Sequence, residues 1–223
     1  MYTLGYWKIR GLRTPITFVL EYANIPYEEK FYEMTKDAEG NWSRDQWLSV
    51  KPNMPLDFPN LPYLEDHSEE AQGLKITQTN AIISYICNKH KVLLPDEGNL
   101  IQQAKMDMMV GVIGDFRMAF VIMSYKTGDT DGYAKNILPD WLEKMEKYFE
   151  KNEFCAGEKM THADFNLYEL LDHHRLVFDN ILKDFPKLEG FMAKIDQLEE
   201  VKKYRASDKW FDHPMNNLCA FVK

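Results

Sequence analysis

The chain has 223 residues, and its 27 basic and 35 acidic side chains give a formal net charge of −8 at pH 7. This acidic surplus argues against nucleic acid or an anionic membrane as a partner, because both repel a negative surface. Apolar residues make up 45% of the chain, which excludes a disordered protein, and no apolar stretch is long enough to cross a membrane. Three cysteines do not make a disulfide framework, and the first residues lack a signal-peptide pattern. We therefore expect a globular, cytoplasmic protein.

The first ninety residues carry strand and helix signals in alternation. Tyr2 to Trp7 is a short apolar run that predicts a strand. Thr14 and Pro15 predict a helix start, with Thr14 as the N-cap, and apolar residues then recur at the spacing of one helix face. A second strand is expected from Tyr27 to Met34, and a short helix from Ser43 to Val50.

A hairpin and a helix are expected at the end of this region. Leu61 to Leu64 and Leu74 to Thr77 flank a polar turn, which is typical of a hairpin. The acidic turn, residues 65–73, is interpreted as a solvated insertion because its like charges repel one another. Thr79 to Lys89 predicts a helix. The order is β-α-β-α-β-β-α, in which the first two strands can pair in parallel across a crossover helix.

From about Pro95 onward the pattern changes to helices alone. They are predicted at Leu100 to Tyr125, Leu138 to Phe149 and Leu188 to Leu198. Thr161 and Asp164 have the spacing of a capping box and predict another helix start. The fold class is therefore α/β plus all-α, with an α/β domain at residues 1–90 and a helical domain at residues 98–223.

General catalytic and metal-binding motifs are absent. The segment Thr127 to Gly132 resembles part of a calcium loop but lacks the first and last ligands, which favours a solvated turn. His173 and His174 are adjacent, so on a helix they point about 100° apart and cannot hold one ion. We expect no metal site.

Polar and aromatic residues gather at the predicted strand and helix ends of the first domain. Tyr6 and Trp7 end the first strand, and Arg44, Trp47 and Lys51 would share one face of a helix. Taken alone, such residues mark a core or a solvated cationic face more often than a site. These residues indicate a binding site only when they are considered together with the segments that follow.

Two further segments are typical of peptide binding. Leu56 to Tyr63 contains two prolines and suits an edge strand or a turn. A cis Leu61–Pro62 bond would leave the backbone of Leu61 free to pair with a peptide-like ligand. Gln78 and Thr79 lie at a predicted helix start, where free N–H groups attract a carboxylate.

Together these segments resemble a cytosolic glutathione transferase of the mu class over essentially the whole chain. The segments that carry the resemblance are Leu4 to Trp7, Ile9 to Leu12, Leu20 to Tyr22, Leu56 to Tyr63, Ile76 to Ile82 and Thr161 to Phe165, together with the loop from Met34 to Arg44. The resemblance implies a thioredoxin-like N-terminal domain and a C-terminal helical bundle. It also implies an enzyme that conjugates glutathione, as co-substrate, to hydrophobic alkyl or aryl electrophiles in detoxification, with no permanently bound cofactor.

The resemblance assigns a role to each matching residue. Tyr6 corresponds to the catalytic tyrosine that hydrogen-bonds the glutathione sulfur. The other glutathione-binding positions are Trp7, Arg44, Trp47, Lys51, Asn60, Leu61, Gln78 and Thr79, where Thr79 replaces the usual Ser. Asp115 would reach the glutathione held by a partner subunit, and Phe58 would be the aromatic key of a homodimer. The second-substrate pocket would be lined by Ile9, Leu12, Arg117, Met118, Val121 and Tyr125.

Some functions stay open on the sequence. A non-catalytic carrier of hydrophobic ligands could use the same fold, as could a glutathione-dependent isomerase or a structural protein with a decayed site. Retention of Tyr6, Asn60 and Gln78 argues against decay. Pro52 and Pro55 depart from the family pattern beside Lys51, and the stretch after Ser207, which closes the second pocket in relatives, matches weakly. The electrophile therefore cannot be inferred.

Overall fold

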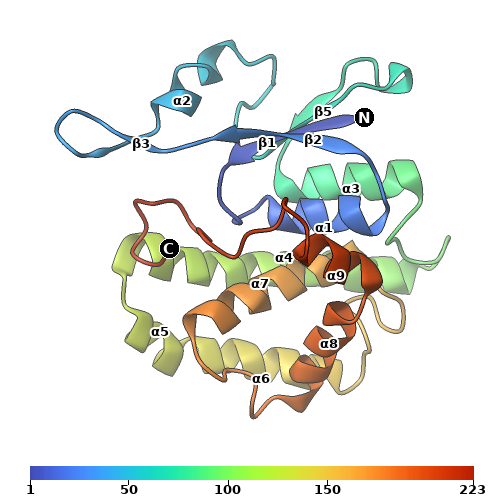
Figure 1. The fold of residues 1–223 in the computed structure, drawn as a ribbon. Coiled ribbons are helices and arrows are strands. Elements are labelled where there is room, and N and C mark those ends of the chain that lie inside the picture. Colours follow the sequence, from blue (N-terminus) through green and yellow to red (C-terminus); the bar gives the residue numbers. More distant parts are fainter.

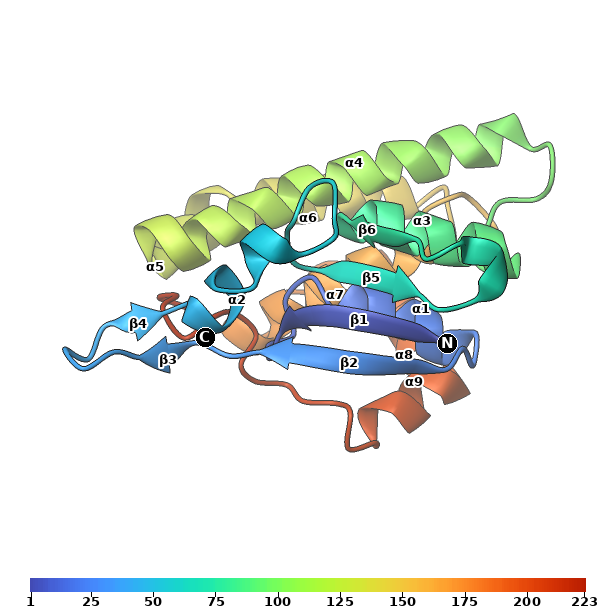
Figure 2. The same cartoon turned by 90° about the horizontal axis from the view of Figure 1, so that it is seen from above.

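The computed structural model describes all 223 residues, and its N-terminal part is a four-stranded sheet with two helices on one face (Figure 1). The strands are β1 (Tyr2–Trp7), β2 (Tyr27–Tyr32), β5 (Tyr63–Asp66) and β6 (Lys75–Thr77), in the order β2-β1-β5-β6 (Figure 2). The covering helices are α1 (Thr14–Tyr22) and α3 (Thr79–His90). As predicted, β1 and β2 pair in parallel across α1, and β5 and β6 form an antiparallel hairpin.

Differences from the predicted elements lie mainly between β2 and β5. The second strand ends at Tyr32, and a small ribbon of β3 (Thr35–Lys36) and β4 (Trp42–Ser43) follows it. The expected helix from Ser43 to Val50 is only α2 (Asp45–Leu48), followed by a 3₁₀ turn at Lys51–Asn53. Pro52 contributes to this break, because proline has no N–H with which to continue a helix.

The two predicted helix caps have opposite outcomes. Thr14 does not cap α1, because the helix already includes Thr14 and its hydroxyl donates to the backbone oxygen of Arg10 at 3.2 Å. The capping box of α7 (His162–Val177) is confirmed, since the N–H of Thr161 donates to the Asp164 carboxylate at 2.7 Å. Asp129, from the supposed solvated turn, caps a further helix by accepting from the N–H of Gly132 at 2.8 Å.

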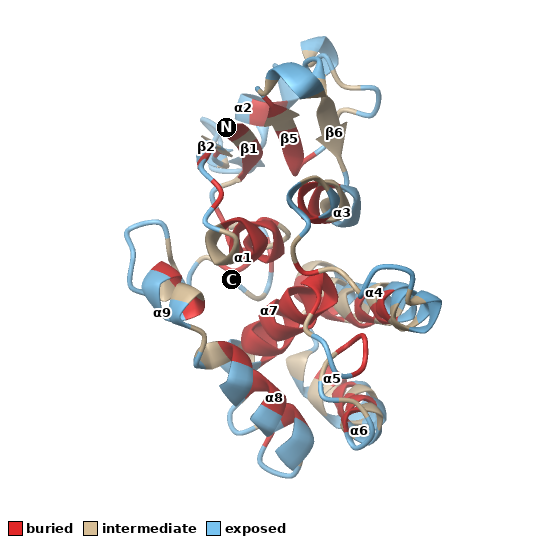
Figure 3. Ribbon diagram, turned by 90° about the vertical axis from the view of Figure 1, so that its right-hand side faces the viewer, coloured by how far each residue is buried: buried red, intermediate tan, exposed pale blue.

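All regular elements of the C-terminal part are helices. Its elements are α4 (Leu100–Ile122), α5 (Thr130–Asn136), α6 (Leu138–Phe149), α7, α8 (Pro186–Asp196) and α9 (Glu199–Arg205). α4 is followed by a π-helical turn, Met123–Thr127, so Tyr125 lies beyond the regular helix that the sequence predicted. α7 is buried along most of its length and contacts α1, α3, α4 and α8 (Figure 3). None of the helices is long and apolar enough to cross a membrane.

Two hydrophobic clusters stabilise this arrangement. The larger one has 40 buried residues and joins the two halves, with Phe18 of α1 stacked on Phe165 of α7 at 5.5 Å between ring centroids. The smaller one contains Tyr6, Ile9, Tyr32, Trp47, Leu61 and Tyr63 and lies where β1, β2 and β5 meet α2. Most of its members are the aromatic and apolar residues that the sequence singled out, so the candidate site is expected beside this cluster.

Candidate functional site

Tyr6 lies at the end of β1 with only 7% of its surface exposed. Its hydroxyl oxygen accepts a hydrogen bond from the backbone N–H of Leu12 at 3.1 Å. Burial raises the pKa of Tyr6, and the Leu12 N–H and the Arg117 charge oppose this shift without reversing it. The phenol is therefore protonated at neutral pH, and its O–H can donate to an acceptor outside the loop.

Gly11 permits this contact. The residue has a φ of +39°, and a Cβ atom there would lie 2.7 Å from the hydroxyl oxygen of Tyr6. Any other residue would therefore displace either the loop or the phenol ring. The position of the Tyr6 hydroxyl therefore depends on the absence of a side chain at Gly11.

A cavity of about 210 Å³ lies between the two halves beside Leu12. Gln78 and Thr79 enter it from the start of α3, and Arg117 enters it from α4. The Thr79 hydroxyl is buried and has no hydrogen-bond partner in the structure. Gln78 has a φ of +76°, an unusual backbone conformation for a residue with a side chain. A helix start, an orphaned hydroxyl and a cation together favour a bound carboxylate.

Arg117 is a cation without a carboxylate partner at this cavity. Its guanidinium donates to the backbone oxygen of Asn166 at 3.1 Å. Burial lowers the pKa of Arg117, while the charge of Glu169 raises it. The sequence placed Arg117 and Leu12 in the second-substrate pocket, but the structure places both in the cavity that contains Gln78 and Thr79. Arg117 also faces Tyr6 closely enough to influence its titration, so it favours negative charge beside the phenol.

The basic and aromatic residues around α2 lie in three neighbouring backbone settings. Arg44 precedes the helix and is exposed, whereas Lys51 is in the following 3₁₀ turn. Trp47 is buried and packs against Tyr32 and Tyr63, with ring centroids 5.2 and 6.3 Å away. The three residues thus differ in burial and in the element that holds them, and Trp47 belongs to the smaller hydrophobic cluster.

The segment before β5 has the predicted cis Leu61–Pro62 bond. However, the N–H of Leu61 is not free, because it donates to the Asn60 side-chain oxygen at 2.9 Å. A peptide-like ligand that pairs with the N–H of Leu61 must first displace the side chain of Asn60. Trp7 is half-buried nearby and packs on the smaller cluster.

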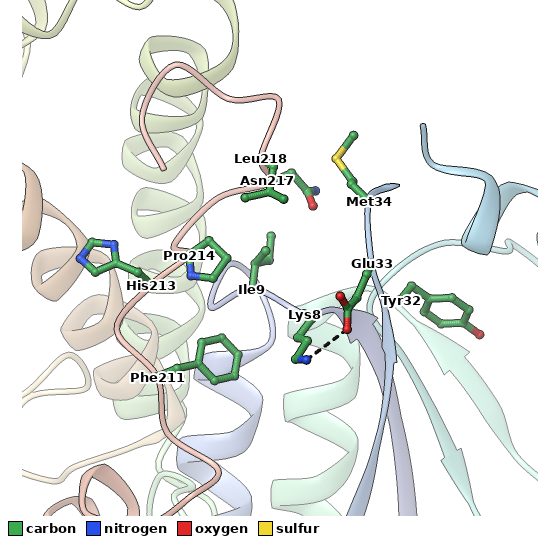
Figure 4. A pocket seen from close by; sticks show the side chains of 10 residues that line it. All are labelled: Lys8, Ile9, Tyr32, Glu33, Met34, Phe211, His213, Pro214, Asn217 and Leu218. Carbon is green, nitrogen blue, oxygen red and sulfur yellow. Dashed lines mark hydrogen bonds and ion pairs between the residues drawn. The ribbon is translucent and has the colours of Figure 1, made fainter. Parts of the chain in front are cut away.

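A second, larger cavity of about 390 Å³ opens between the loop after β1, the segment after β2 and the C-terminal residues (Figure 4). Ile9 lines it opposite Met34. The lining residues that the sequence did not single out for this pocket are Lys8, Tyr32, Glu33, Met34, Phe211, His213, Pro214, Asn217 and Leu218. Lys8 and Glu33 form an ion pair of 3.1 Å, so the charges of these two lining residues largely neutralise each other. The cavity is suited to a mostly apolar molecule.

The remaining predicted wall residues lie outside this second cavity. Met118 is exposed on α4, and Val121 is half-buried one turn later. The Tyr125 hydroxyl accepts a hydrogen bond from the N–H of Asn217 at 2.8 Å, and burial raises the pKa of Tyr125 to about 12. The predicted dimer residues Asp115 and Phe58 are both exposed.

Comparisons with known proteins agree with this architecture. A sequence model described as "Glutathione S-transferase, N-terminal domain" matches residues 2–88, and one described as "Glutathione S-transferase, C-terminal domain" matches residues 114–208. This chain belongs to the glutathione S-transferase family. Its fold, too, is that of the family: the crystal structure of the glutathione S-transferase Blo t 8 has a TM-score of 0.80, 27% sequence identity and 99% coverage of both chains.

Curated relatives place the chain in the mu class of glutathione S-transferases. Glutathione S-transferase Mu 5 of Mus musculus is 38% identical over 219 residues, which cover 97% of this chain and 93% of that protein. Glutathione S-transferase B of Cavia porcellus is 37% identical over 221 residues, with 98% and 97% covered. The predicted family, fold class and enzyme activity are therefore confirmed: the protein is a glutathione S-transferase, with glutathione as its co-substrate and no permanently bound cofactor.

Proposed function

We propose that Tyr6 stabilises the thiolate of glutathione, which then attacks an electrophilic carbon of an apolar second substrate. The S–H proton leaves to solvent, a carbon–sulfur bond forms, and the leaving group departs with its electron pair. The observation that carries this proposal is the protonated Tyr6 hydroxyl, whose oxygen is held by Leu12 while its proton remains available. A tyrosine that acted as a phenolate base would first have to lose that proton, against the upward pKa shift that burial causes.

The energies are adequate for this role. A free thiol has a pKa of about 8.5, and lowering it by about two units requires roughly 2.7 kcal/mol. A hydrogen bond to a charged acceptor contributes about 1.5–3 kcal/mol, so one phenol O–H supplies most of it. Arg117, which faces Tyr6 and lacks a carboxylate partner, adds favourable charge. Together they account for ionisation of the thiol near neutral pH.

Glutathione is assigned to the first domain, residues 1–90, with its γ-glutamyl carboxylate at Gln78 and Thr79. The unpartnered Thr79 hydroxyl supports this orientation, because it needs an acceptor or donor from a ligand. The backbone of the cysteinyl residue would pair with Asn60 and Leu61, and the glycyl end would extend toward Trp7, Arg44, Trp47 and Lys51. The electrophile is assigned to the 390 Å³ cavity, one wall of which comes from the helical domain, residues 98–223.

The working enzyme is proposed to be a cytoplasmic homodimer, with Phe58 as the contact residue and Asp115 reaching the neighbouring glutathione. Both side chains are exposed in the single chain, as such contacts require. Carriage of hydrophobic ligands without catalysis is not proposed, because a carrier needs neither the Tyr6–Leu12 contact nor Arg117 beside it.

A steady-state assay with glutathione and 1-chloro-2,4-dinitrobenzene tests this proposal, with wild type compared with Tyr6→Phe. We expect turnover to fall by one to two orders of magnitude, roughly the value of one charged hydrogen bond, and activity to begin at higher pH. Tyr22→Phe is the matched control, because that ring packs on Phe165 away from the site. Equal turnover and pH profile in wild type and Tyr6→Phe would show that Tyr6 is not the stabilising group.

A further inference from the structure

The C-terminal segment after α9, residues 207–223, crosses between the two halves of the molecule (Figure 1). We call this segment the strap. It forms one wall of the 390 Å³ cavity through Phe211, Pro214 and Leu218 (Figure 4). Its contacts with the loop after β1 give it a second role, which concerns Tyr6.

Two arginines, one of them buried, anchor the beginning of the strap. Trp210 packs against the guanidinium groups of Arg10 and Arg205, which lie 4.6 and 4.8 Å from its ring centroid. Arg10 is itself fixed to α7 by ion pairs with Glu169 at 2.6 Å and Asp172 at 2.7 Å. Removing either partner of such a buried ion pair is strongly destabilising, so the anchor has a defined geometry.

The next strap residues bind the backbone of the Tyr6 loop. The N–H of Arg10 donates to the backbone oxygen of Pro214 at 2.9 Å, and the N–H of Gly11 donates to that of Met215 at 3.0 Å. The following N–H, that of Leu12, donates to the hydroxyl of Tyr6 at 3.1 Å. Three consecutive amides of one loop are therefore engaged, two by the strap and one by the phenol.

We propose that the strap is a positioning element for catalysis: by holding the amides of Arg10 and Gly11, it fixes the Leu12 N–H against the Tyr6 oxygen and so aims the Tyr6 O–H at the glutathione sulfur. This inference rests on the proposed role of Tyr6. Accepting the Leu12 hydrogen bond polarises the phenol and strengthens its own donation. Loss of the strap contacts would let the loop and the ring move, and the thiolate would lose stabilisation.

Other ionisable groups also face Tyr6 and are retained in the test. Arg117 faces it from α4, and Tyr125 faces it from the turn after α4. Neither donates to the two strap carbonyls, which accept from Arg10 and Gly11. The Tyr125 hydroxyl accepts from the N–H of Asn217 in the strap, so Tyr125→Phe, which removes that contact alone, is measured beside each strap variant to isolate the effect of the loop amides.

The test measures ionisation of the glutathione thiol in the binary complex, by its thiolate ultraviolet absorbance against pH, without a second substrate. Met215 is 1% exposed, so Met215→Asp buries a charge where the strap packs against the Tyr6 loop. We expect the strap to leave this position, because an unpaired buried charge is costly. We expect the apparent pKa of the bound thiol to rise by about one unit, a tenfold loss of thiolate below that pKa. Phe221→Asp, at a strap residue that is 67% exposed, is the matched control and should leave the thiol unchanged.

The possible outcomes separate this inference from the proposed function. If the bound thiol is no more acidic than free glutathione in wild type, both are wrong. If it is more acidic in wild type and unchanged in folded Met215→Asp, the strap inference alone is wrong. Should thermal melting show that Met215→Asp does not fold, Met215→Ala decides by the same criterion. In a Tyr6→Phe background the strap substitution should add no further shift, and an additive shift would also overturn the inference.

Discussion

Single residues around Tyr6 determine whether the site can form. The sequence singled out Tyr6, Gln78 and Thr79 as site residues only through their resemblance to a family, because no local pattern relates residues so far apart in the chain. Arg117 was placed with the second substrate by the resemblance, whereas the structure puts it in the cavity lined by Gln78 and Thr79. The orphaned Thr79 hydroxyl has no sequence signal at all.

Gly11 provides a prediction about close approach. Gly11→Ala adds a Cβ atom 2.7 Å from the Tyr6 oxygen, so we expect at least a tenfold loss of kcat/KM in the conjugation assay, equivalent to about 1.4 kcal/mol or more. Gly40→Ala is the matched control, because Gly40 also has a positive φ but has nothing within 4 Å of its added Cβ. Both variants should lose stability because of the positive φ, and Gly11→Ala should lose more because its Cβ also meets Tyr6. Equal kcat/KM in the two would mean that Tyr6 tolerates displacement.

Thr79 provides a prediction in which stability and affinity change in opposite directions. Thr79→Val removes a buried hydroxyl that lacks a partner, so the free protein should gain up to about 1–3 kcal/mol in its free energy of unfolding. The same change removes a hydrogen bond to the glutathione carboxylate, so KM for glutathione should rise about tenfold. Chemical denaturation and initial rates measure the two effects. A lower unfolding free energy with an unchanged KM would show that this hydroxyl serves the fold and not the ligand.

At the scale of elements, the sequence predicted what short-range patterns determine. The crossover pairing of β1 with β2, the hairpin and the capping box at Thr161 all follow from periodicity and spacing, and all are present. The ribbon of β3 and β4 and the π-helical turn after Ile122 are not predicted, because they depend on the neighbours that these segments meet. That turn changes the direction of Tyr125, whose hydroxyl then binds the strap.

The central helix α7 should make stability depend on pH. Burial lowers the pKa of His174 to about 3, and the ring is held by Tyr133 and the backbone oxygen of Leu170. The unfolded chain takes up a proton at this residue below about pH 6.5, whereas the folded chain does not until about pH 3. The stability that neutral His174 contributes is therefore fully present above pH 6.5. Below that pH the free energy of unfolding decreases by up to about 1.4 kcal/mol per pH unit because of this residue.

Denaturant unfolding at pH 7.5, 5.5 and 4.5 measures this dependence. His174→Gln should lower stability at pH 7.5, because a shorter uncharged side chain leaves the Tyr133 hydroxyl and packing contacts unsatisfied. It should also flatten the decline toward acid. A His67→Gln control, at an exposed position, should keep the wild-type slope. If His174→Gln keeps the full wild-type dependence of stability on pH, the acid sensitivity comes from other buried groups, such as His162.

The whole molecule depends on contacts between residues far apart in the chain, and these were the least predictable. The two-part architecture follows from the change of pattern near Pro95, but the strap joins Arg10 to Trp210 and Gly11 to Met215 across some two hundred positions. No local pattern in the tail indicates this path. Of the residues predicted to line the second-substrate pocket, Ile9 alone lines the large cavity, one wall of which is made by the strap.

The surface of the single chain predicts a dimer. Phe58 is 79% exposed, and α4 presents Ile101, Met108 and Ile122, all exposed and separated by multiples of seven residues, which places them on one face. Such apolar exposure is costly in water and is typical of a protein interface. We expect sedimentation to show a dimer for wild type and a monomer for Phe58→Asp. Phe221→Asp, which adds the same charge at another exposed aromatic, should remain dimeric.

The same experiment tests whether the site is complete in one subunit. If Asp115 of one subunit contacts the glutathione of the other, the Phe58→Asp monomer should bind glutathione more weakly, with KM raised about tenfold for the loss of one charged hydrogen bond. Asp115→Asn should raise KM to a similar extent while remaining dimeric, because this exposed carboxylate is not needed for the apolar contact. A monomer with the wild-type KM would confine the glutathione site to a single chain, and a monomeric wild type would remove the proposed role of Phe58.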